Sequence, residues 1–492
     1  MFDWLDFPPH NHRWKSGPTL FTFTSEELVR IPEAKTLRDH GRKACFAGCA
    51  AFACLVIVTL TAPMSAMVEP SQLEASLRAV GGHERPAISE TNDEARALLA
   101  ASASARLPSN SVEGLQVARP PFFRTPAWWP TIVTPVDSIQ TAIDAARPGA
   151  TIWVLPGVYE GPLTIHKPLR LLGFPVSGPG GVVLIPPEGG AENGISVLPA
   201  DSDSGSYLRK VVIAHFTVWG FEENGIYARQ TDGLLLLGIR AIDNGEYGLY
   251  PVLSRNGIIA HSEASGSADA GIYVGQSVDF LIQENTTHAN VVGVEVSNSR
   301  NVVVTRNTVF DNSIGVLAAL LPPSERIIVA DAADIHIHHN HIISNNHPNF
   351  AGDGEFASAV PAGSGVVVLG CRDTLVAHNK VFGNAFAGVA VASTKSFLRV
   401  FLLLRGRTPE EVEATLAAIP NDLDPGGVQV RDNAVFANGT LPESPVPPGL
   451  PGVPAWLPAD LLWDGTGTGN CWADNIHQKK EPASLPACHN AP

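Results

Sequence analysis

The chain has 492 residues, including 45 glycines and 40 prolines; only 16% of its residues are charged, and its formal net charge is -15. This composition favours a turn-rich β protein over a helical one. The acidic balance argues against nucleic acid or anionic lipid as a partner, because both would repel the protein. An acidic surface attracts cations instead, and Ca²⁺ suits clustered oxygen ligands.

The N-terminal part predicts a single membrane anchor. Residues 44–68 contain no charged side chain and are long enough to cross a bilayer as a helix. The basic residues Arg38, Arg42 and Lys43 precede them, so residues 1–43 should stay in the cytoplasm and the rest should be periplasmic or extracellular. A cleaved signal peptide is the alternative, although its leader would be unusually long.

A linker and a short helix are expected next. Residues 69–134 show no sustained apolar pattern and predict a low-order tether between the membrane and the following domain. Residues 136–147 predict a helix, because Asp137 or Ser138 can cap it and an apolar stripe follows. This helix would cover the open end of the domain and prevent edge pairing.

A recurring phrase between residues 224 and 388 determines the expected fold. In this phrase a glycine is followed by an apolar residue and then by a larger residue, and the phrase returns every 22 or 23 residues. A period of this size, built from short alternating strands, is typical of a β solenoid in which each repeat forms one turn. The glycines are Gly225, Gly248, Gly271, Gly293 and Gly315. Asparagines recur in the same period and should form stacked columns in the turns.

The period predicts a solenoid of about ten turns over residues 135–440. Interruptions of the period indicate insertions near residues 317–333, 346–363 and 393–425. The last insertion contains Thr408-Pro409-Glu410-Glu411, a capping box that should open a helix. Residues 441–492 are expected to form a C-terminal cap and tail, in which Cys471 and Cys488 can pair if they lie in an oxidising compartment.

The repeats resemble those of right-handed parallel β-helix proteins, the broad group with the pectate-lyase fold. The opening of the domain is similar too, from Ser138-Ile139-Gln140 through Pro156-Gly157-Val158-Tyr159 to Leu171-Leu172-Gly173. Three phrases resemble an envelope-associated subfamily without an assigned activity: Gly248-Leu249-Tyr250-Pro251-Val252, Gly271-Ile272-Tyr273-Val274-Gly275-Gln276-Ser277 and Asn349-Phe350-Ala351. The resemblance implies an all-β, right-handed parallel β-helix from about residue 135 to 480.

Alternation along the strands predicts two rows of candidate site residues on the outer face. The first row consists of Tyr227, Tyr250, Tyr273 and Glu295. The second row, two residues before each glycine, consists of Glu223, Glu246 and Asp269. Aromatic rings on a flat face suit sugar rings, whereas a row of carboxylates calls for a cation or for a basic group such as Arg229 or Arg255. Such ladders also stabilise stacked strands without binding a ligand.

Three function classes remain open on this sequence. The favoured one is a binding surface for an envelope polysaccharide or a partner protein. The alternative is a polysaccharide lyase or uronate epimerase that uses Glu246, Asp269 and Glu295 with Arg255 as base. Enzymes of the resembled fold carry clustered aspartates or an Asp-Pro-His-Asp phrase, and the regular turns contain neither. The third class is a structural subunit that docks a membrane complex through its insertions.

A histidine run is the second candidate site. His336 and His338 share one face of a predicted strand, and His378 occupies in a later turn the place of His339. Two imidazoles on one face, with a third ligand from a neighbouring turn, would suit Zn²⁺. A set of solvated surface imidazoles is the simpler interpretation. Apart from Ca²⁺ and Zn²⁺, the sequence indicates no cofactor.

Overall fold

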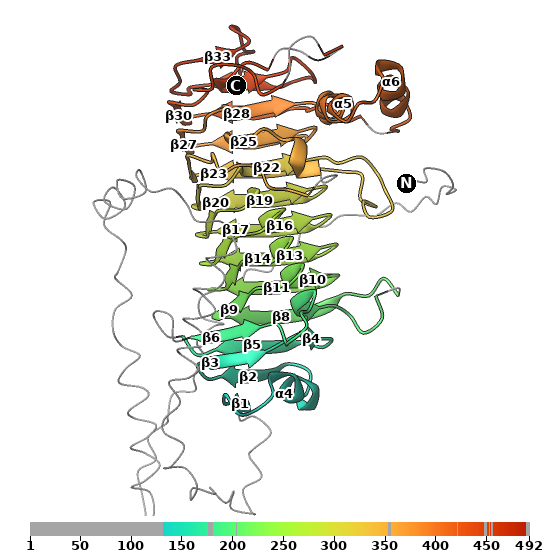
Figure 1. Ribbon diagram of the computed structural model, residues 1–492, viewed down its shortest axis with the longest axis vertical. Helices are drawn as coiled ribbons and strands as arrows, with labels where there is room; N and C mark the ends of the chain where they lie inside the picture. Colours follow the sequence, from blue (N-terminus) through green and yellow to red (C-terminus); the bar gives the residue numbers. More distant parts are fainter. Residues whose placement is uncertain are drawn as a thin grey trace, which may run out of the picture. The chain divides into compact units, whose positions relative to one another are not determined.

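The computed structural model describes residues 131–488 except 176–180, 203, 353–355, 421, 447–449, 452 and 454–455. The described chain winds into a coil whose turns stack along one axis (Figure 1). Each complete turn, called a rung below, contributes one strand to each of three parallel sheets. The predicted cytoplasmic segment, the transmembrane helix at 44–68 and the tether up to residue 130 lie outside the described residues. In the part that is described, no helix is both long and apolar enough to cross a membrane.

Sheet A contains 12 strands among the described residues. They are β1 (Thr131–Val133), β2 (Ala150–Val154), β5 (Leu169–Gly173), β8 (Leu208–Ala214), β11 (Thr231–Leu237), β14 (Arg255–Ala260), β17 (Val278–Gln283), β20 (Arg300–Thr305), β23 (Ala333–His338), β26 (Leu375–Ala377), β29 (Gln429–Arg431) and β32 (Cys471–Ala473). Sheet B contains 10 strands in the same range. They are β3 (Gly157–Glu160), β6 (Val182–Ile185), β9 (Phe216–Trp219), β12 (Arg240–Ile242), β15 (Glu263–Ser265), β18 (Thr286–His288), β21 (Thr308–Phe310), β24 (His341–Ile343), β27 (Lys380–Phe382) and β30 (Ala434–Phe436).

Sheet C carries the phrase that recurs in the sequence, and 11 of its strands are described. They are β4 (Leu163–Ile165), β7 (Asn193–Val197), β10 (Asn224–Arg229), β13 (Tyr247–Val252), β16 (Ala270–Gly275), β19 (Val292–Ser297), β22 (Ile314–Ala319), β25 (Ser364–Leu369), β28 (Ala387–Ala392), β31 (Ala459–Trp463) and β33 (Lys480–Glu481). Strands β31 to β33 show that parallel pairing continues beyond residue 440, where the sequence pattern fades.

The inward row of sheet C forms the predicted apolar column. Its side chains pair in register from one strand to the next and are fully buried. They are Ile226, Leu249, Ile272, Val294 and Val316. No single rung could remove these side chains from water, so the stacking of successive rungs supplies the hydrophobic core.

Asparagine ladders tie the rungs together at two corners of the coil. In the first ladder, each Asn Oδ1 accepts hydrogen bonds from the backbone N–H and the side-chain amide of the Asn one rung earlier, as at Asn340 and Asn379 (both 3.0 Å). This ladder runs through Asn285, Asn307, Asn340, Asn379, Asn433 and Asn475. The second ladder runs through Asn290, Asn312, Asn345, Asn384 and Asn438 and ends on Asp460. The predicted structural role of these asparagines is confirmed.

Within the described residues, three α-helices accompany the strands. Helix α4 (Ile139–Ala145) lies at the N-terminal end of the coil, and Ser138 caps it by accepting from Thr141 N–H. Helix α6 (Pro409–Ala417) begins with the predicted capping box. Helix α5 (Thr394–Leu404) was not predicted, because its apolar face packs on sheet C rather than following a repeat. A short 3₁₀ turn, η3 (Phe356–Ala359), lies against α5.

Insertions cover one part of the outer face of sheet C. They leave the coil after β22, β24 and β28, and α5 and α6 extend from that side at the level of β28 (Figure 1). A second hydrophobic cluster lies between this face and the inserted residues, which include Phe350, Phe356 and Phe397. The insertions therefore cover the later rungs, whereas outward side chains of the earlier strands β10 and β13 stay partly exposed.

Candidate functional site

The predicted tyrosine row is present on the outer face of sheet C. Tyr227 pairs with Tyr250, and Tyr273 pairs with Glu295, so the four residues occupy successive rungs. The ring centroids of Tyr227 and Tyr250 are 5.4 Å apart, and those of Tyr250 and Tyr273 are 5.0 Å apart. Tyr227 and Tyr250 are half-buried, whereas Tyr273 is buried. The row thus begins near solvent and ends in the protein interior.

The predicted acid row lies beside the tyrosines at the corner that precedes each strand. The backbone N–H of Glu246 donates to the carbonyl of Glu223 (2.7 Å), and the N–H of Asp269 donates to that of Glu246 (3.0 Å). The row also extends one rung earlier, because the N–H of Glu223 donates to the carbonyl of Glu192 (2.9 Å). The backbone positions of successive acids therefore follow one another at about one strand spacing, ~4.8 Å, along the coil.

Glu295 and Asp269 lie near each other where the two rows meet, since the charge of Asp269 acts on the Glu295 carboxyl. Glu295 is only 4% exposed. Burial raises the pKa of Glu295 to about 8, and the negative charge of Asp269 adds to the increase, while the hydrogen bond from Ser297 opposes it. The Ser297 hydroxyl donates to Glu295 Oε1 at 2.6 Å. Glu295 is consequently protonated at neutral pH.

Two tyrosines contribute to the surroundings of this carboxyl pair: Tyr247 bonds Asp269, and Tyr273 bonds the Ser297 that contacts Glu295. The Tyr247 hydroxyl donates to Asp269 Oδ2, and its ring stacks on Tyr250 with centroids 4.3 Å apart. The Tyr273 hydroxyl is hydrogen-bonded with Ser297. Burial raises the pKa of both tyrosines, and nearby acids raise it further. Both hydroxyls therefore stay protonated and remain hydrogen-bond donors.

Gly275 makes room for the Tyr273 ring. A Cβ at this position would collide with ring carbons of Tyr273 and with its hydroxyl, so the ring lies across the backbone of its own strand. Any larger residue at 275 would displace the ring and break the contact with Ser297.

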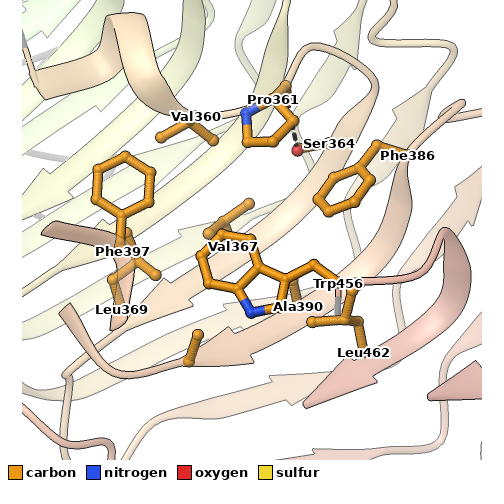
Figure 2. A pocket seen from close by; sticks show the side chains of 11 residues that line it. Val360, Pro361, Ser364, Val367, Leu369, Phe386, Ala390, Phe397, Trp456 and Leu462 are labelled. Atoms are coloured by element: carbon orange, nitrogen blue, oxygen red, sulfur yellow. Dashed lines mark hydrogen bonds between the residues drawn. The ribbon is translucent and has the colours of Figure 1, made fainter. Parts of the chain in front are cut away.

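Beyond Glu295 the same outer row becomes apolar. It continues as Leu317, Val367, Ala390 and Leu462. Phe397, Trp456 and Phe386 cover these later rungs and line a small apolar pocket, in which the Ser364 hydroxyl donates to the Pro361 carbonyl at 2.7 Å (Figure 2). The polar candidate site thus ends where the insertions begin.

The predicted base, Arg255, lies away from the acid row. Arg255 is on sheet A, forms an ion pair with Asp232 (3.0 Å) and lies over the ring of Tyr207. Arg255 is therefore engaged on a different sheet from Glu246, Asp269 and Glu295, the acids with which the sequence analysis grouped it as a base.

The histidine run forms contacts without forming a metal site. His338 Nδ1 lies 2.9 Å from His339 Nδ1, and the rings of His339 and His378 are 5.0 Å apart. His336 is exposed on the outer face of sheet A. Across the described part of the chain, no three His, Cys, Asp or Glu side chains are grouped so that they could hold a metal ion. The contacts fit surface imidazoles.

Sequence reasoning missed two side chains of the site. Ser297 lies two residues after Glu295 and shares its face by strand alternation, so the pattern contained this signal. Tyr247 stands three residues before Tyr250, which by alternation should place it on the opposite face. It precedes the glycine at the corner of the coil, where alternation does not hold.

Three parallel sheets wound into one coil define a parallel β-helix protein, here with an aromatic and acidic outer face. Residues 190–321 and 224–400 match the family model described as a right handed beta helix region. The chain is therefore a right-handed parallel β-helix protein, as its repeats predicted. No curated protein sequence matches it.

Three solved structures are similar to this chain at low sequence identity. The A-module of the mannuronan C-5 epimerase AlgE4 from Azotobacter vinelandii is 17% identical, with a TM-score of 0.47, over 73% of this chain and 97% of that one. The periplasmic alginate epimerase AlgG is 14% identical, with a TM-score of 0.34, over 70% and 83%. The DFA-IIIase from Arthrobacter chlorophenolicus A6 is 14% identical, with a TM-score of 0.41, over 74% and 100%.

Proposed function

We propose that the outer face of sheet C, at β10 and β13, binds a polysaccharide. The observation that carries this proposal is the mutual contact of tyrosine rings from three successive rungs, Tyr227, Tyr247, Tyr250 and Tyr273. Aromatic rings supply contact area for the faces of sugar rings, and the neighbouring carboxylates accept hydrogen bonds from sugar hydroxyls. A polymer can follow the rows along the coil, whereas a small ligand would use only one rung.

The exposure of the side chains favours binding over catalysis. Glu246 is exposed and Tyr227 and Tyr250 are half-buried, so a ligand can reach them. Glu295 and Tyr273 are 4% and 6% exposed. A catalytic acid must come within hydrogen-bond distance of the reacting atom. In this structure Glu295 is hydrogen-bonded to Ser297 instead.

The tyrosine row provides the test of binding. Substituting Tyr250→Ala should weaken binding of the recognised polysaccharide about tenfold, because it removes the central ring of the row. Affinity gel electrophoresis against a panel of polysaccharides measures this change. Tyr207→Ala is the matched control, since Tyr207 is 37% exposed but contacts Arg255 of sheet A. Equal losses in both variants, or no loss in either, would contradict the proposal.

A carbohydrate-active enzyme is the second candidate, and the carboxyl pair favours it. A protonated Glu295 can donate a proton as a general acid, and the Asp269 carboxylate beside it can accept one as a general base. Uronate polymers with and without Ca²⁺ are the substrates to screen, using ultraviolet absorbance for unsaturated products and proton NMR for epimerised residues. Turnover that Glu295→Gln abolishes would replace the binding proposal with the enzyme.

We further propose that residues 44–68 anchor the protein in a membrane and that residues 69–130 tether the coil outside the cytoplasm. The charge-free segment behind a basic cluster supports this, and so does the disulfide between Cys471 and Cys488, because disulfides persist in oxidising compartments. The full chain should stay in the membrane pellet after an alkaline carbonate wash, and a variant lacking 44–68 should not. A mature N-terminus after residue 66, found by mass spectrometry, would instead establish a cleaved signal peptide.

A further inference from the structure

We infer that the coil has a second binding face, at the corner between sheets A and B and on the adjoining outer face of sheet B, and that this face takes a negatively charged polysaccharide. The inference goes beyond the proposed function, which concerns sheet C. Three features carry it: basic side chains on successive rungs, the engagement of the neighbouring acids by other partners, and an apolar row that runs beside the basic groups.

The corner between sheets A and B presents basic side chains on three successive rungs. Arg306, His339 and His378 occupy equivalent positions there, because the strands on either side of them pair in register. On sheet B, His341 pairs with Lys380 one rung later. All five side chains are exposed, and they are called the basic face below. Basic groups therefore follow one another at about one strand spacing, ~4.8 Å, along the coil.

The groups of the basic face lie close enough to act on one another. The rings of His339 and His378 are 5.0 Å apart. Burial lowers the pKa of His338, which stands beside His339, and the basic groups around the corner lower it further. Burial also lowers the pKa of His341, and the charge of Lys380 adds to the decrease. Positive charges at this density repel one another, and a bound anion would relieve the repulsion.

The acidic side chains that flank the corner are engaged by other partners. One rung before the three basic residues, Glu284 Oε2 lies 3.2 Å from His261 Nδ1. One rung after them, Asp432 forms an ion pair with Arg431 at 2.9 Å. Among the described residues, neither the arginine nor the lysine of the basic face forms an ion pair or a side-chain hydrogen bond. This face therefore keeps positive charge for a ligand, although the whole chain is acidic.

An apolar row on the outer face of sheet B runs beside the basic groups. It consists of Phe310, Ile343, Phe382 and Phe436. The rings of Phe382 and Phe436 lie within 7° of parallel, with centroids 5.6 Å apart, and Phe436 is 42% exposed. Lys380 and Phe382 both point outward, because Val381 between them is buried. Their backbone positions are therefore about 6.6 Å apart, so one ligand can contact a cation and a ring together.

A negatively charged polysaccharide matches both rows. The apolar faces of its sugar rings would pack on the phenylalanine rings, and its anionic groups would pair with the guanidinium, ammonium and imidazole groups. A chain of sugars that follows the coil would bring successive anionic groups to successive rungs. A neutral polysaccharide would leave the basic groups unpaired, whereas a polymer of phosphate alone would leave the apolar row uncovered.

Isothermal titration calorimetry of the full chain, in a neutral detergent and without divalent cations, tests the inference with two matched pairs of sugars. The first pair is a galacturonate oligomer and its methyl ester, and the second is dextran sulfate and dextran of the same length. We expect the charged member of at least one pair to bind at least about tenfold more tightly than its neutral partner. Its affinity should fall as salt is added. The two pairs distinguish carboxylate from sulfate as the recognised group.

Variants of the basic face locate the binding. Lys380→Gln and Arg306→Gln should each weaken binding of the charged sugar about threefold, and Phe436→Ala should weaken it by a similar factor. Arg170→Gln is the matched control for the cations, because Arg170 is exposed on β5, several rungs away. Tyr207→Ala is the control for the ring, because Tyr207 is 37% exposed and contacts Arg255 on sheet A. Both controls should leave the affinity unchanged.

Four other outcomes would overturn the inference. In the first, the charged and neutral members of each pair bind equally or not at all. In the second, linear polyphosphate binds as tightly as the charged sugar and Phe436→Ala leaves both affinities unchanged, which means that the face recognises charge alone. In the third, Tyr250→Ala abolishes binding of the charged sugar and Lys380→Gln does not, which places that sugar on sheet C. In the fourth, Arg170→Gln weakens binding as much as Lys380→Gln. The first, second and fourth outcomes leave the proposal for sheet C intact, because the tyrosine variants test it separately.

Discussion

Replacing Glu295 by glutamine is expected to make the protein more stable at alkaline pH, by about 4 to 5 kcal/mol at pH 9 relative to wild type, with almost no difference near pH 4. The glutamine keeps the size of the protonated side chain but cannot ionise. In the native protein, burial and the charge of Asp269 raise the pKa of Glu295 to about 8. In the unfolded chain the same carboxyl ionises near its ordinary pKa of 4.5.

The sign of the effect follows from these two values. Below pH 4.5 the carboxyl is protonated in both states, so the native state carries no penalty. Between pH 4.5 and 8 only the unfolded state releases the proton, so the wild-type free energy of unfolding falls as pH rises. Above pH 8 both states are ionised and the loss stays constant. The variant lacks this loss over the whole range.

Urea unfolding followed by far-ultraviolet circular dichroism at pH 4, 7 and 9 measures the difference. Glu160→Gln is the matched control, because Glu160 is an exposed carboxylate at the end of β3. It should follow the wild-type dependence on pH. If Glu295→Gln also followed it, Glu295 would be ionised in the native protein at neutral pH.

The period of the sequence predicted the positions of the tyrosines but not their surroundings. Register depends on local repeats, because a strand of sheet C that begins with the glycine phrase can pair with its neighbour in only one way that keeps Ile226 and Leu249 inside. The rows of Tyr227, Tyr250 and Tyr273 follow from that. The burial of Glu295 does not, because no repeat specifies which side chains cover the outer face, and inserted residues such as Phe350 join the hydrophobic cluster there.

The repeat pattern also failed to predict the last rungs at the C-terminal end of the coil. β31 pairs with β28 although the chain between Phe436 and Ala459 breaks the period. At this point Asp460 takes the place of an asparagine in the second ladder, accepting from Asn438 N–H (3.0 Å) and from Gln478 N–H (2.8 Å). A carboxylate can serve here because it accepts on both oxygens, whereas an Asn offers only one. Because an aspartate stands where the sequence pattern has an asparagine, the pattern did not predict the last rungs.

The largest loss of stability is expected from Asn340→Ala, at about 3 to 5 kcal/mol. Asn340 is fully buried in the middle of the first ladder. Its Oδ1 accepts from the N–H and the amide of Asn307, and its own amide donates to the Val304 carbonyl (2.9 Å). Alanine would leave the N–H of Asn307 buried without a partner and would remove the bond to the Val304 carbonyl, because the closed coil admits no water there.

The ladder itself supplies the control for that prediction. At the same position three rungs earlier, Ser262 accepts from Ile239 N–H (3.1 Å) and donates to the Ala260 carbonyl (2.9 Å). A hydroxyl can therefore make some of the hydrogen bonds that the asparagine amide makes. Asn340→Ser should therefore lose less stability than Asn340→Ala in urea unfolding. Asn346→Ala should lose less than about 1 kcal/mol, because Asn346 is exposed and water replaces its bonds. Equal losses for the serine and alanine variants at 340 would mean that side-chain volume, and not hydrogen bonding between rungs, holds the corner of the coil.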